Sequence, residues 1–249
     1  MRKNTLLKLC LCFAVALFEL PLMAQGVVVW KKDGTQVKFA YEEIDSIVTY
    51  NVDEDVEDEP VTPPAVVGIE AVDLGLSVKW ASCNVGATSP EEYGDYFAWG
   101  ETQPKDSYTE SNSVTYDLSD SELESRGIID AAGNLTAEYD AATANWGGNW
   151  RMPTLAEMKE LINNCTWEWT TLSGVYCRKV TGPNGNSIFL PAAGCRYDEW
   201  LIYAGSFGCY WSATLLRDSN SAFILAYSLS DGDFGYGRCN GQAVRPVKE

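Results

Sequence analysis

WRMPTLAEMKELI, residues 150–162, contains the clearest helix signal in the chain. Thr154 and Glu157 have the spacing of a capping box, in which each side chain bonds to the other residue's free backbone N–H at the start of a helix. Apolar residues then recur at helical spacing. The residues that share this apolar face are Leu155, Met158, Leu161 and Ile162. The sequence therefore predicts a helix that begins at Thr154 and packs one face on a core.

Short β segments follow this helix. Residues 175–181 and 187–190 flank GPNGN (182–186), which is typical of a hairpin connection. Further strand candidates, separated by turns rich in Gly, Ser and Asp, are 209–214, 222–228 and 242–247. The part of the chain after the helix is thus expected to be mostly β.

The segment before the helix is less regular. We expect a hairpin around Gly75, a long surface loop over 105–137 and a short helix at 140–145. Together with the helix at Thr154 and the strands that follow it, these elements predict an α+β domain with irregular loops over residues 67–249.

A smaller unit precedes this domain. Residues 27–30 and 37–41 are rich in β-forming residues and flank Asp33-Gly34, a dipeptide that favours a tight hairpin turn. A third strand at 44–50 would complete a small β module over 25–50. Residues 51–66 contain the acidic run DEDVEDE and three prolines, which predicts an extended linker. Cation capture by this run is the alternative, but no glycine turn gathers its carboxylates as a calcium loop requires.

Residues 1–24 have the pattern of a secretory signal peptide. Arg2, Lys3 and Lys8 precede an apolar run that is too short to span a bilayer, and cleavage is expected after Ala24. We therefore expect an exported protein that is extracellular, at the cell surface or periplasmic, with no membrane-spanning segment. Six cysteines would remain after cleavage, and an even number in an exported protein suggests disulfides of undetermined pairing. They are Cys83, Cys165, Cys177, Cys195, Cys209 and Cys239.

The composition excludes several classes of function. The chain has no histidine, so His-dependent nucleophile activation, His-ligated zinc and imidazole proton transfer are all absent. Its formal net charge is −17, and no basic stripe is present to replace the counterions of a phosphate backbone. Nucleic acid is therefore not an expected partner.

Seven blocks of the predicted domain carry a family resemblance. They are VDLGL (72–76), WASCNVGA (80–87), WGET (99–102), WRMPT (150–154), FLPAAG (189–194), YWS (210–212) and VRPV (244–247). In this order they resemble the Fibrobacter succinogenes major paralogous domain of exported bacterial proteins, over residues 69–248. That domain is similar to the formylglycine-generating-enzyme fold, itself a C-type-lectin-like scaffold. The resemblance implies a C-type-lectin-like domain with irregular loops, preceded by a small N-terminal hairpin module, but a fold does not fix a function.

Five tryptophans in or beside these blocks are expected to form the core, because tryptophan is usually highly buried. Stacking on sugar rings is the alternative interpretation. The five are Trp80, Trp99, Trp146, Trp150 and Trp211.

No catalytic or metal-binding constellation stands out. Formylglycine-generating relatives use a cysteine pair near the end of the domain, whereas Cys239 has no second cysteine four or five residues away. The calcium-binding motifs of C-type lectins, Glu-Pro-Asn, Gln-Pro-Asp and Trp-Asn-Asp, do not occur, and Asp231-Gly232-Asp233 is typical of an exposed turn. A pair of carboxylates for glycoside hydrolysis is an alternative that the sequence leaves open, because acidic residues are abundant. We expect no catalytic residue, no bound metal and no cofactor.

Residues 212–241 have an unusual composition. They contain no Lys, Glu, Gln, Trp or Met, and every residue type present can be written by a codon that ends in cytosine. This pattern resembles the variable segment of diversity-generating-retroelement target proteins, in which adenines of asparagine codons are randomised. The alternative is an ordinary β segment that lacks five residue types.

These observations predict a non-catalytic protein that recognises a protein or glycan ligand at the cell surface through a C-terminal face. Its alternatives are a structural or adhesive surface component without variable specificity and, third, an enzyme of the formylglycine-generating type. Aromatic and arginine side chains are expected to supply the contact area. The expected binding face is Cys209, Leu215, Leu216, Arg217, Phe223, Ile224, Tyr227, Asp231, Asp233, Phe234 and Tyr236, with Trp200, Tyr203 and Phe207 at its rim.

Overall fold

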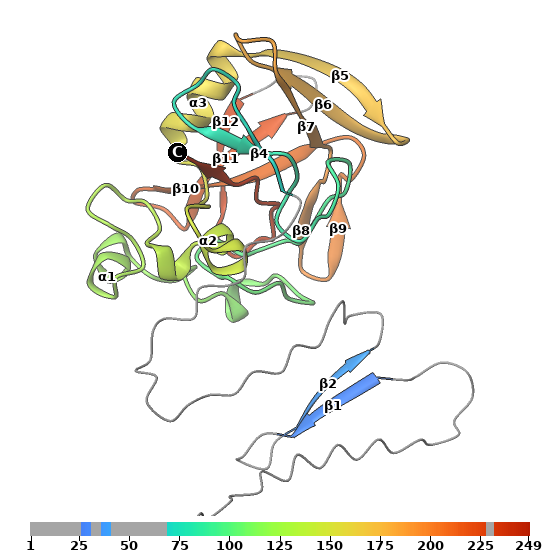
Figure 1. Ribbon diagram of the computed structural model, residues 1–249. Coiled ribbons are helices and arrows are strands. Elements are labelled where there is room, and N and C mark those ends of the chain that lie inside the picture. The colour runs from blue at the N-terminus through green and yellow to red at the C-terminus, as the bar shows by residue number, and fades with distance from the viewer. Residues whose placement is uncertain (1–25, 31–35, 41–68, 228–231) are drawn as a thin grey trace, which may run out of the picture. The chain divides into compact units, whose positions relative to one another are not determined.

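The computed structural model describes residues 26–30, 36–40, 69–227 and 232–249, and of 26–30, 36–40 and 232–234 it describes the backbone alone. The chain divides into two compact units, Met1–Glu59 and Pro60–Glu249. In the first unit β1 (Gly26–Trp30) pairs antiparallel with β2 (Gln36–Ala40), which confirms the predicted hairpin (Figure 1). The predictions for 1–24, for a third strand at 44–50 and for the linker at 51–66 lie outside the described residues.

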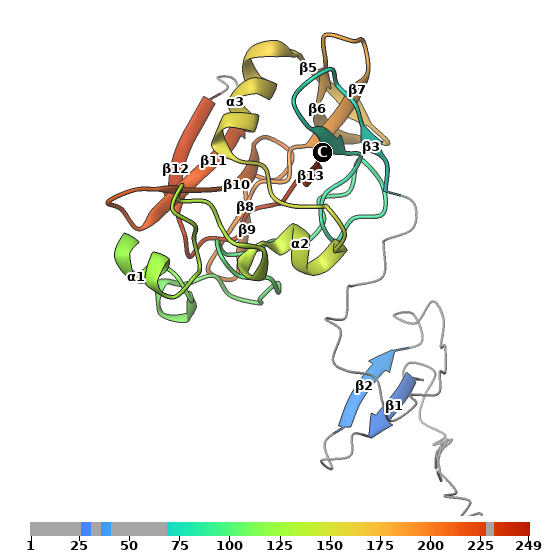
Figure 2. The ribbon, with the colours of Figure 1, turned by 60° about the vertical axis from the view of Figure 1, so that its left-hand side comes forward.

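In its described residues the second unit combines three short α-helices with several small antiparallel sheets, so the broad α+β class is confirmed (Figures 1 and 2). The central sheet has the order β10-β11-β12, with bounds Gly208–Leu216, Ser221–Tyr227 and Gly232–Gly237. A second sheet, β5-β6-β7, spans Thr166–Leu172, Val175–Thr181 and Ser187–Pro191. A third, β13-β4-β3, joins Val247–Lys248, Lys79–Ala81 and Ala71–Val72. The last, β8-β9, is a hairpin of Cys195–Tyr197 and Trp200–Ile202.

Helix α3 (Leu155–Asn164) begins as the sequence predicts. Thr154 and Glu157 form the capping box, and the Thr154 N–H donates to Glu157 Oε2 at 2.8 Å. Arg151 donates to both oxygens of the same carboxylate, at 2.6 and 2.8 Å, so the first turn is held from two sides. Met158 and Leu161 are fully buried, and Figure 2 shows the helix lying against the central sheet. The predicted helix at 140–145 is also present, as α2 (Ala141–Trp146) with Asp140 as its N-cap.

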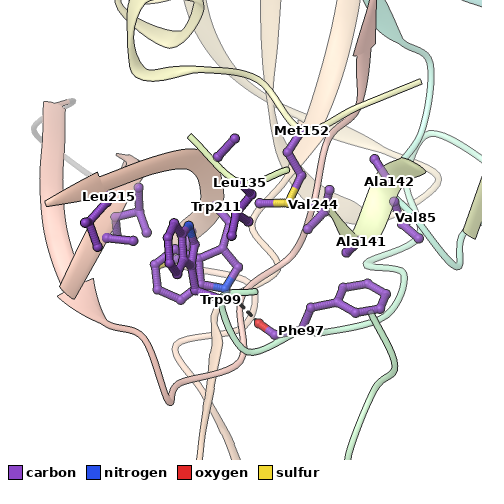
Figure 3. Packing of buried hydrophobic residues seen from close by; sticks show 14 of the residues in the cluster. Val85, Phe97, Trp99, Leu135, Ala141, Ala142, Met152, Trp211, Leu215 and Val244 are labelled. Atoms are coloured by element: carbon purple, nitrogen blue, oxygen red, sulfur yellow. Dashed lines mark hydrogen bonds between the residues drawn. The ribbon is translucent and has the colours of Figure 1, made fainter. Parts of the chain in front are cut away.

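The core consists of two main clusters, one on each face of the β10-β11 pair. Alternation along β10 directs Tyr210 to one cluster and Trp211 to the other. Figure 3 shows the rings of Trp99 and Trp211 beside each other in the larger cluster. Their indole N–H groups donate to backbone carbonyls, Trp211 to Phe97 at 2.7 Å and Trp99 to Ser212 at 3.0 Å. The two rings therefore bury a large apolar area and also join distant segments.

The predicted core tryptophans are confirmed. Trp80, Trp99, Trp146 and Trp211 are buried, and the half-buried Trp150 packs edge-on against Trp146 with the ring centroids 5.4 Å apart. The four buried rings present no face for stacking on a sugar, and Lys248 Nζ lies 4.5 Å from the centre of the Trp150 ring.

Arg245 joins three of the sequence blocks. Its guanidinium is fully buried and donates to Asn84 Oδ1 at 2.8 Å, to the Ala81 carbonyl at 2.9 Å and to the Phe189 carbonyl at 2.9 Å. Burial lowers its pKa, because the charged form loses hydration. A buried arginine with several acceptors acts as a rigid connector, so VRPV, WASCNVGA and FLPAAG meet at one point.

The structure corrects the expectation of a plain surface loop over 105–137. Helix α1 (Asp120–Ser125) lies there, with a capping box formed by Ser119 and Glu122, and its Leu123 is fully buried together with Ile128. The short 3₁₀ turns at Glu110–Asn112 and Ala137–Tyr139 also fall in or at the end of this segment. The predicted strand at 242–247 is also corrected. Only β13 is a strand there, because Gln242 and Ala243 make isolated bridges and Pro246 has no N–H to donate.

Candidate ligand-binding site

The β8-β9 hairpin is the most exposed apolar feature of the described chain. Tyr197 pairs with Trp200 across a turn made by Asp198 and Glu199, and Asp198 has a positive φ of 53°. Aspartate tolerates this left-handed conformation better than most residues do. The Asp198 backbone exchanges two hydrogen bonds of 3.0 Å with Tyr108, and Ser107 Oγ donates to Asp198 Oδ1 at 2.8 Å. The turn is therefore fixed to a neighbouring loop.

Four large apolar side chains on this hairpin and directly after it face solvent. Their exposed fractions are 59% for Tyr197, 70% for Trp200, 39% for Leu201 and 61% for Tyr203. Elsewhere in the described residues only Val114 and Tyr176 are large, apolar and this exposed. Single exposed apolar residues are normal, whereas four within seven consecutive residues make this segment the candidate interaction site of the described chain. We call these four residues the hairpin patch.

Tyr203 has a strained backbone conformation. Its φ is 62°, which is unusual for a bulky residue and occurs mainly where surrounding contacts impose it. Those contacts are present here, because the Tyr203 carbonyl accepts hydrogen bonds from the backbone N–H groups of Ser206 and Phe207 at 3.1 and 3.0 Å. Its ring also lies 6.3 Å from the Phe207 ring, centroid to centroid. The ring of Tyr203 is thus held in a fixed position outside the core.

Hydrogen bonds join the base of the hairpin to the rest of the domain. The Arg196 backbone exchanges hydrogen bonds with Gly241 at 2.7 and 2.9 Å, and its guanidinium lies 5.5 Å from the centre of the Tyr96 ring. Arg196 also donates to the Glu199 carbonyl at 3.3 Å. On the opposite face the Tyr236 hydroxyl lies 3.8 Å from Cys195 Sγ, so β12 adjoins the hairpin.

Four of the predicted binding residues are corrected, because they are buried and cannot present a side chain to a ligand. Cys209, Leu215, Ile224 and Tyr227 have exposed fractions of 0 to 3%. Alternation along β10 and β11 turns them into one or the other core cluster. The Tyr227 hydroxyl, for example, donates to the Pro191 carbonyl at 2.6 Å, and its ring stacks on Tyr210.

The other predicted residues fall in different places. Trp200 and Tyr203 belong to the hairpin patch, and the half-buried Phe207 and Tyr236 adjoin it.

Arg217 lies away from the hairpin, at the β10-β11 turn, where it pairs with Glu124 of α1 at 3.2 Å and with Asp120 at 3.8 Å. Leu216 and Phe223 are half-buried. Asp231 lies outside the described residues, and of Asp233 and Phe234 only the backbone, in β12, is described.

The sequence did not single out Tyr197 and Leu201, which complete the patch. The turn dipeptide Asp198-Glu199 between two aromatic residues was the available signal, but strands of three residues are too short for periodicity to reveal.

One buried carboxylate, that of Asp140, has the raised pKa that is typical of some catalytic groups. Asp140 is almost fully buried, and burial raises its pKa. Its two oxygens, however, accept the backbone N–H groups of Thr143 at 2.9 Å and Met152 at 2.8 Å. It lines a recess of about 260 Å³ beside Trp150 and Arg151. This carboxylate caps α2 and anchors the strand-like segment before α3, which is a structural role.

No group of His, Cys, Asp and Glu residues that could hold a metal ion occurs among the described residues. In the same part of the chain, no helix has the length and apolar character needed to cross a membrane. Comparisons of the chain with protein-family models, with curated proteins and with solved structures give no match.

Proposed function

We propose that this chain is an exported, non-catalytic binding protein that recognises its ligand through the hairpin patch. The observation that carries the proposal is the concentration of four exposed apolar side chains on one hairpin whose turn and base are both fixed by hydrogen bonds. Trp and Tyr supply large contact areas with few rotatable bonds, so a patch made of them binds with a small loss of entropy. Export rests on the signal-like pattern of residues 1–24.

A protein surface is the ligand class that this geometry favours over a glycan. The four side chains lie on an exposed hairpin and on the residue after it, and the recesses of about 260 and 350 Å³ are lined by other residues. Small ligands are usually enclosed by a concave site, whereas aromatic side chains on a projecting element insert into a partner. The half-buried Phe207 and Tyr236 extend the proposed contact area toward β12.

The C-type-lectin-like frame and the family resemblance belong to the same proposal. The hydrogen bonds of Arg245 support this part of the proposal, because they join three of the sequence blocks into one structural unit. Diversification of residues 212–241 is a further part of the proposal. In that segment Leu216, Arg217, Phe223 and Tyr236 are at least partly exposed, and variation at such positions leaves the frame intact.

The test is a binding screen of the purified chain against a glycan array and against a phage-displayed protein library. A ligand found in the screen is then measured with wild type, with Trp200→Ala and with Tyr203→Ala. We expect each variant to weaken binding at least 10-fold, because truncation of a central aromatic typically costs about 2 kcal/mol or more. Tyr176→Ala is the matched control, because Tyr176 is an aromatic residue with an exposed fraction of 57% that lies outside the hairpin.

The proposal fails if both aromatic variants bind as tightly as wild type while folding normally. A ligand found on the glycan array alone, with binding lost in the variants, would keep the patch and replace the protein ligand by a glycan.

A further inference from the structure

Cys195 and Cys209 lie side by side at the base of the hairpin. Gly194 and Gly208 form a parallel bridge, and each cysteine is the next residue along its strand, Cys195 in β8 and Cys209 in β10. Neighbouring strands are about 4.8 Å apart. A disulfide requires Cα atoms about 4.4–6.8 Å apart, and the general spacing of paired strands falls within this range. Both side chains are only 1% exposed, and in the structure both are free thiols, since no two described cysteines lie at bonding distance.

The two sulfur atoms interact with each other and with one tyrosine. The Tyr236 hydroxyl lies 3.8 Å from the Cys195 sulfur. The neighbouring Cys209 thiol and this hydroxyl lower the pKa of Cys195, while Cys195 and burial raise the pKa of Cys209. The other four described cysteines differ, because burial raises the pKa of each and no second thiol contributes.

We propose that Cys195 and Cys209 form a modification site, at which a disulfide closes the segment 195–209 when the chain folds in an oxidising compartment. That segment contains the entire hairpin patch. The bond would therefore hold both ends of the proposed ligand-binding segment on the frame. The disulfide itself does not depend on the proposed function, and only its consequence for binding does.

The chemistry is thiol–disulfide exchange with a disulfide donor such as oxidised glutathione. The Cys195 thiolate attacks one donor sulfur, a mixed disulfide forms, and the other donor sulfur leaves as a thiolate. Cys209 then loses its proton and attacks the Cys195 sulfur, which expels the second donor thiolate. Two protein thiols thus lose two protons and two electrons, and one donor disulfide becomes two thiols. Because both thiols are buried in the folded chain, the exchange takes place while the chain folds, and either of the two cysteines can then be the one that attacks the donor first.

The test uses the exposed hairpin as a cleavage site. The full chain is unfolded with reductant, refolded in reduced and oxidised glutathione, alkylated, and nicked with chymotrypsin, which cleaves after exposed aromatic residues such as Tyr197, Trp200 and Tyr203. Mass spectrometry confirms a nick between residues 197 and 203. We expect the two fragments to stay joined on a non-reducing gel and to separate with reductant. Peptide mapping should identify the bond between Cys195 and Cys209.

Cysteine variants make the result specific. Cys209→Ala should separate the fragments without reductant, whereas Cys239→Ala, the matched control on the same side of the nick, should leave them joined. Fragments that separate in wild type, or that stay joined in Cys209→Ala, would overturn the proposal. Wild-type Tm should also fall by roughly 6–12 °C on reduction, as expected for a short closed loop in a domain of this size. Cys177→Ala should show the same fall.

A Cys209→Ala variant that does not fold leaves the peptide map of wild type as the decisive measurement. An unlinked Cys195 in that map also overturns the proposal. Trp200→Ala tests the binding proposal separately. This variant should lose the ligand while its fragments stay joined, and a variant that keeps both the ligand and the joined fragments would contradict the binding proposal alone.

Discussion

Gly194 fixes the direction in which the hairpin leaves the frame. Its φ is 65°, and a Cβ atom added there would collide with the backbone of Ile202 and Ala204. Its N–H donates to the Phe207 carbonyl at 2.7 Å, so the backbone cannot move away without breaking this bond. We expect Gly194→Ala to lower the free energy of unfolding by about 2–5 kcal/mol, the sum of left-handed strain and overpacking.

Urea unfolding measures this effect, and Gly205→Ala is its matched control. Gly205 has a φ of 81° in the same loop, but an added Cβ meets nothing within 4 Å. Only the strain term applies there, about 1–2 kcal/mol. Equal losses at the two glycines would show that close packing at Gly194 does not matter.

At the same scale, the sequence predicted the core better than the surface. Trp99 and Trp211 were predicted because a large ring is nearly always buried. The composition of their segment predicts Ile224 and Tyr227 on the binding face, but composition does not tell which face of a strand a residue occupies. The shift in register between Trp211 and Leu215 adds a further irregularity that no alternation pattern contains.

At the scale of elements, the capping box of α3 makes stability depend on pH. Burial acts to raise the pKa of Glu157, but the hydrogen bonds from Arg151 and Thr154 outweigh it and hold the pKa below its usual value. The carboxylate therefore contributes stability above its unfolded pKa of about 4.3, and this contribution is lost as the pH falls through the lower folded pKa. We expect Glu157→Gln to cost about 1–2 kcal/mol at pH 7 and progressively less below pH 4.

Urea unfolding of wild type and variant over a series of pH values tests this. Glu168→Gln is the control, because Glu168 is exposed on β5 and its replacement should stay within about 0.5 kcal/mol of wild type. A cost of Glu157→Gln that did not change between pH 7 and the acid range would exclude the carboxylate charge as its cause.

The sequence predicts long helices and strands with clear capping residues better than short ones. Helix α3 has ten residues and a clear capping box, so its start was predicted to the residue. Helix α1 has a capping box too, at Ser119 and Glu122, but only Leu123 is apolar enough to indicate a buried face. The strands of the β8-β9 hairpin have three residues each, and their position depends on contacts with Tyr108 and Gly241 that are distant in sequence.

At the scale of the whole described domain, the frame and the patch differ in how they are supported. Strands β10 and β11 are packed between two core clusters, whereas the outer end of the hairpin is exposed and is held by hydrogen bonds to loops. Backbone amide hydrogens in a strand that is packed on both faces exchange with solvent only when the whole domain unfolds, while those in an exposed hairpin exchange through local opening. We therefore expect the slowest hydrogen exchange at Trp211 and Ile224, and exchange faster by orders of magnitude at Trp200 and Leu201.

Hydrogen–deuterium exchange with peptide-level mass spectrometry measures this difference, and reduction provides the internal comparison. If the Cys195–Cys209 bond closes the hairpin segment, adding reductant should speed exchange in residues 196–207 and leave β10 and β11 unchanged. Equal acceleration in both regions would mean that the bond stabilises the whole domain and not the hairpin alone. Exchange at Trp200 as slow as at Ile224 would contradict the division into frame and patch, because an opening hairpin would then require the core to open with it.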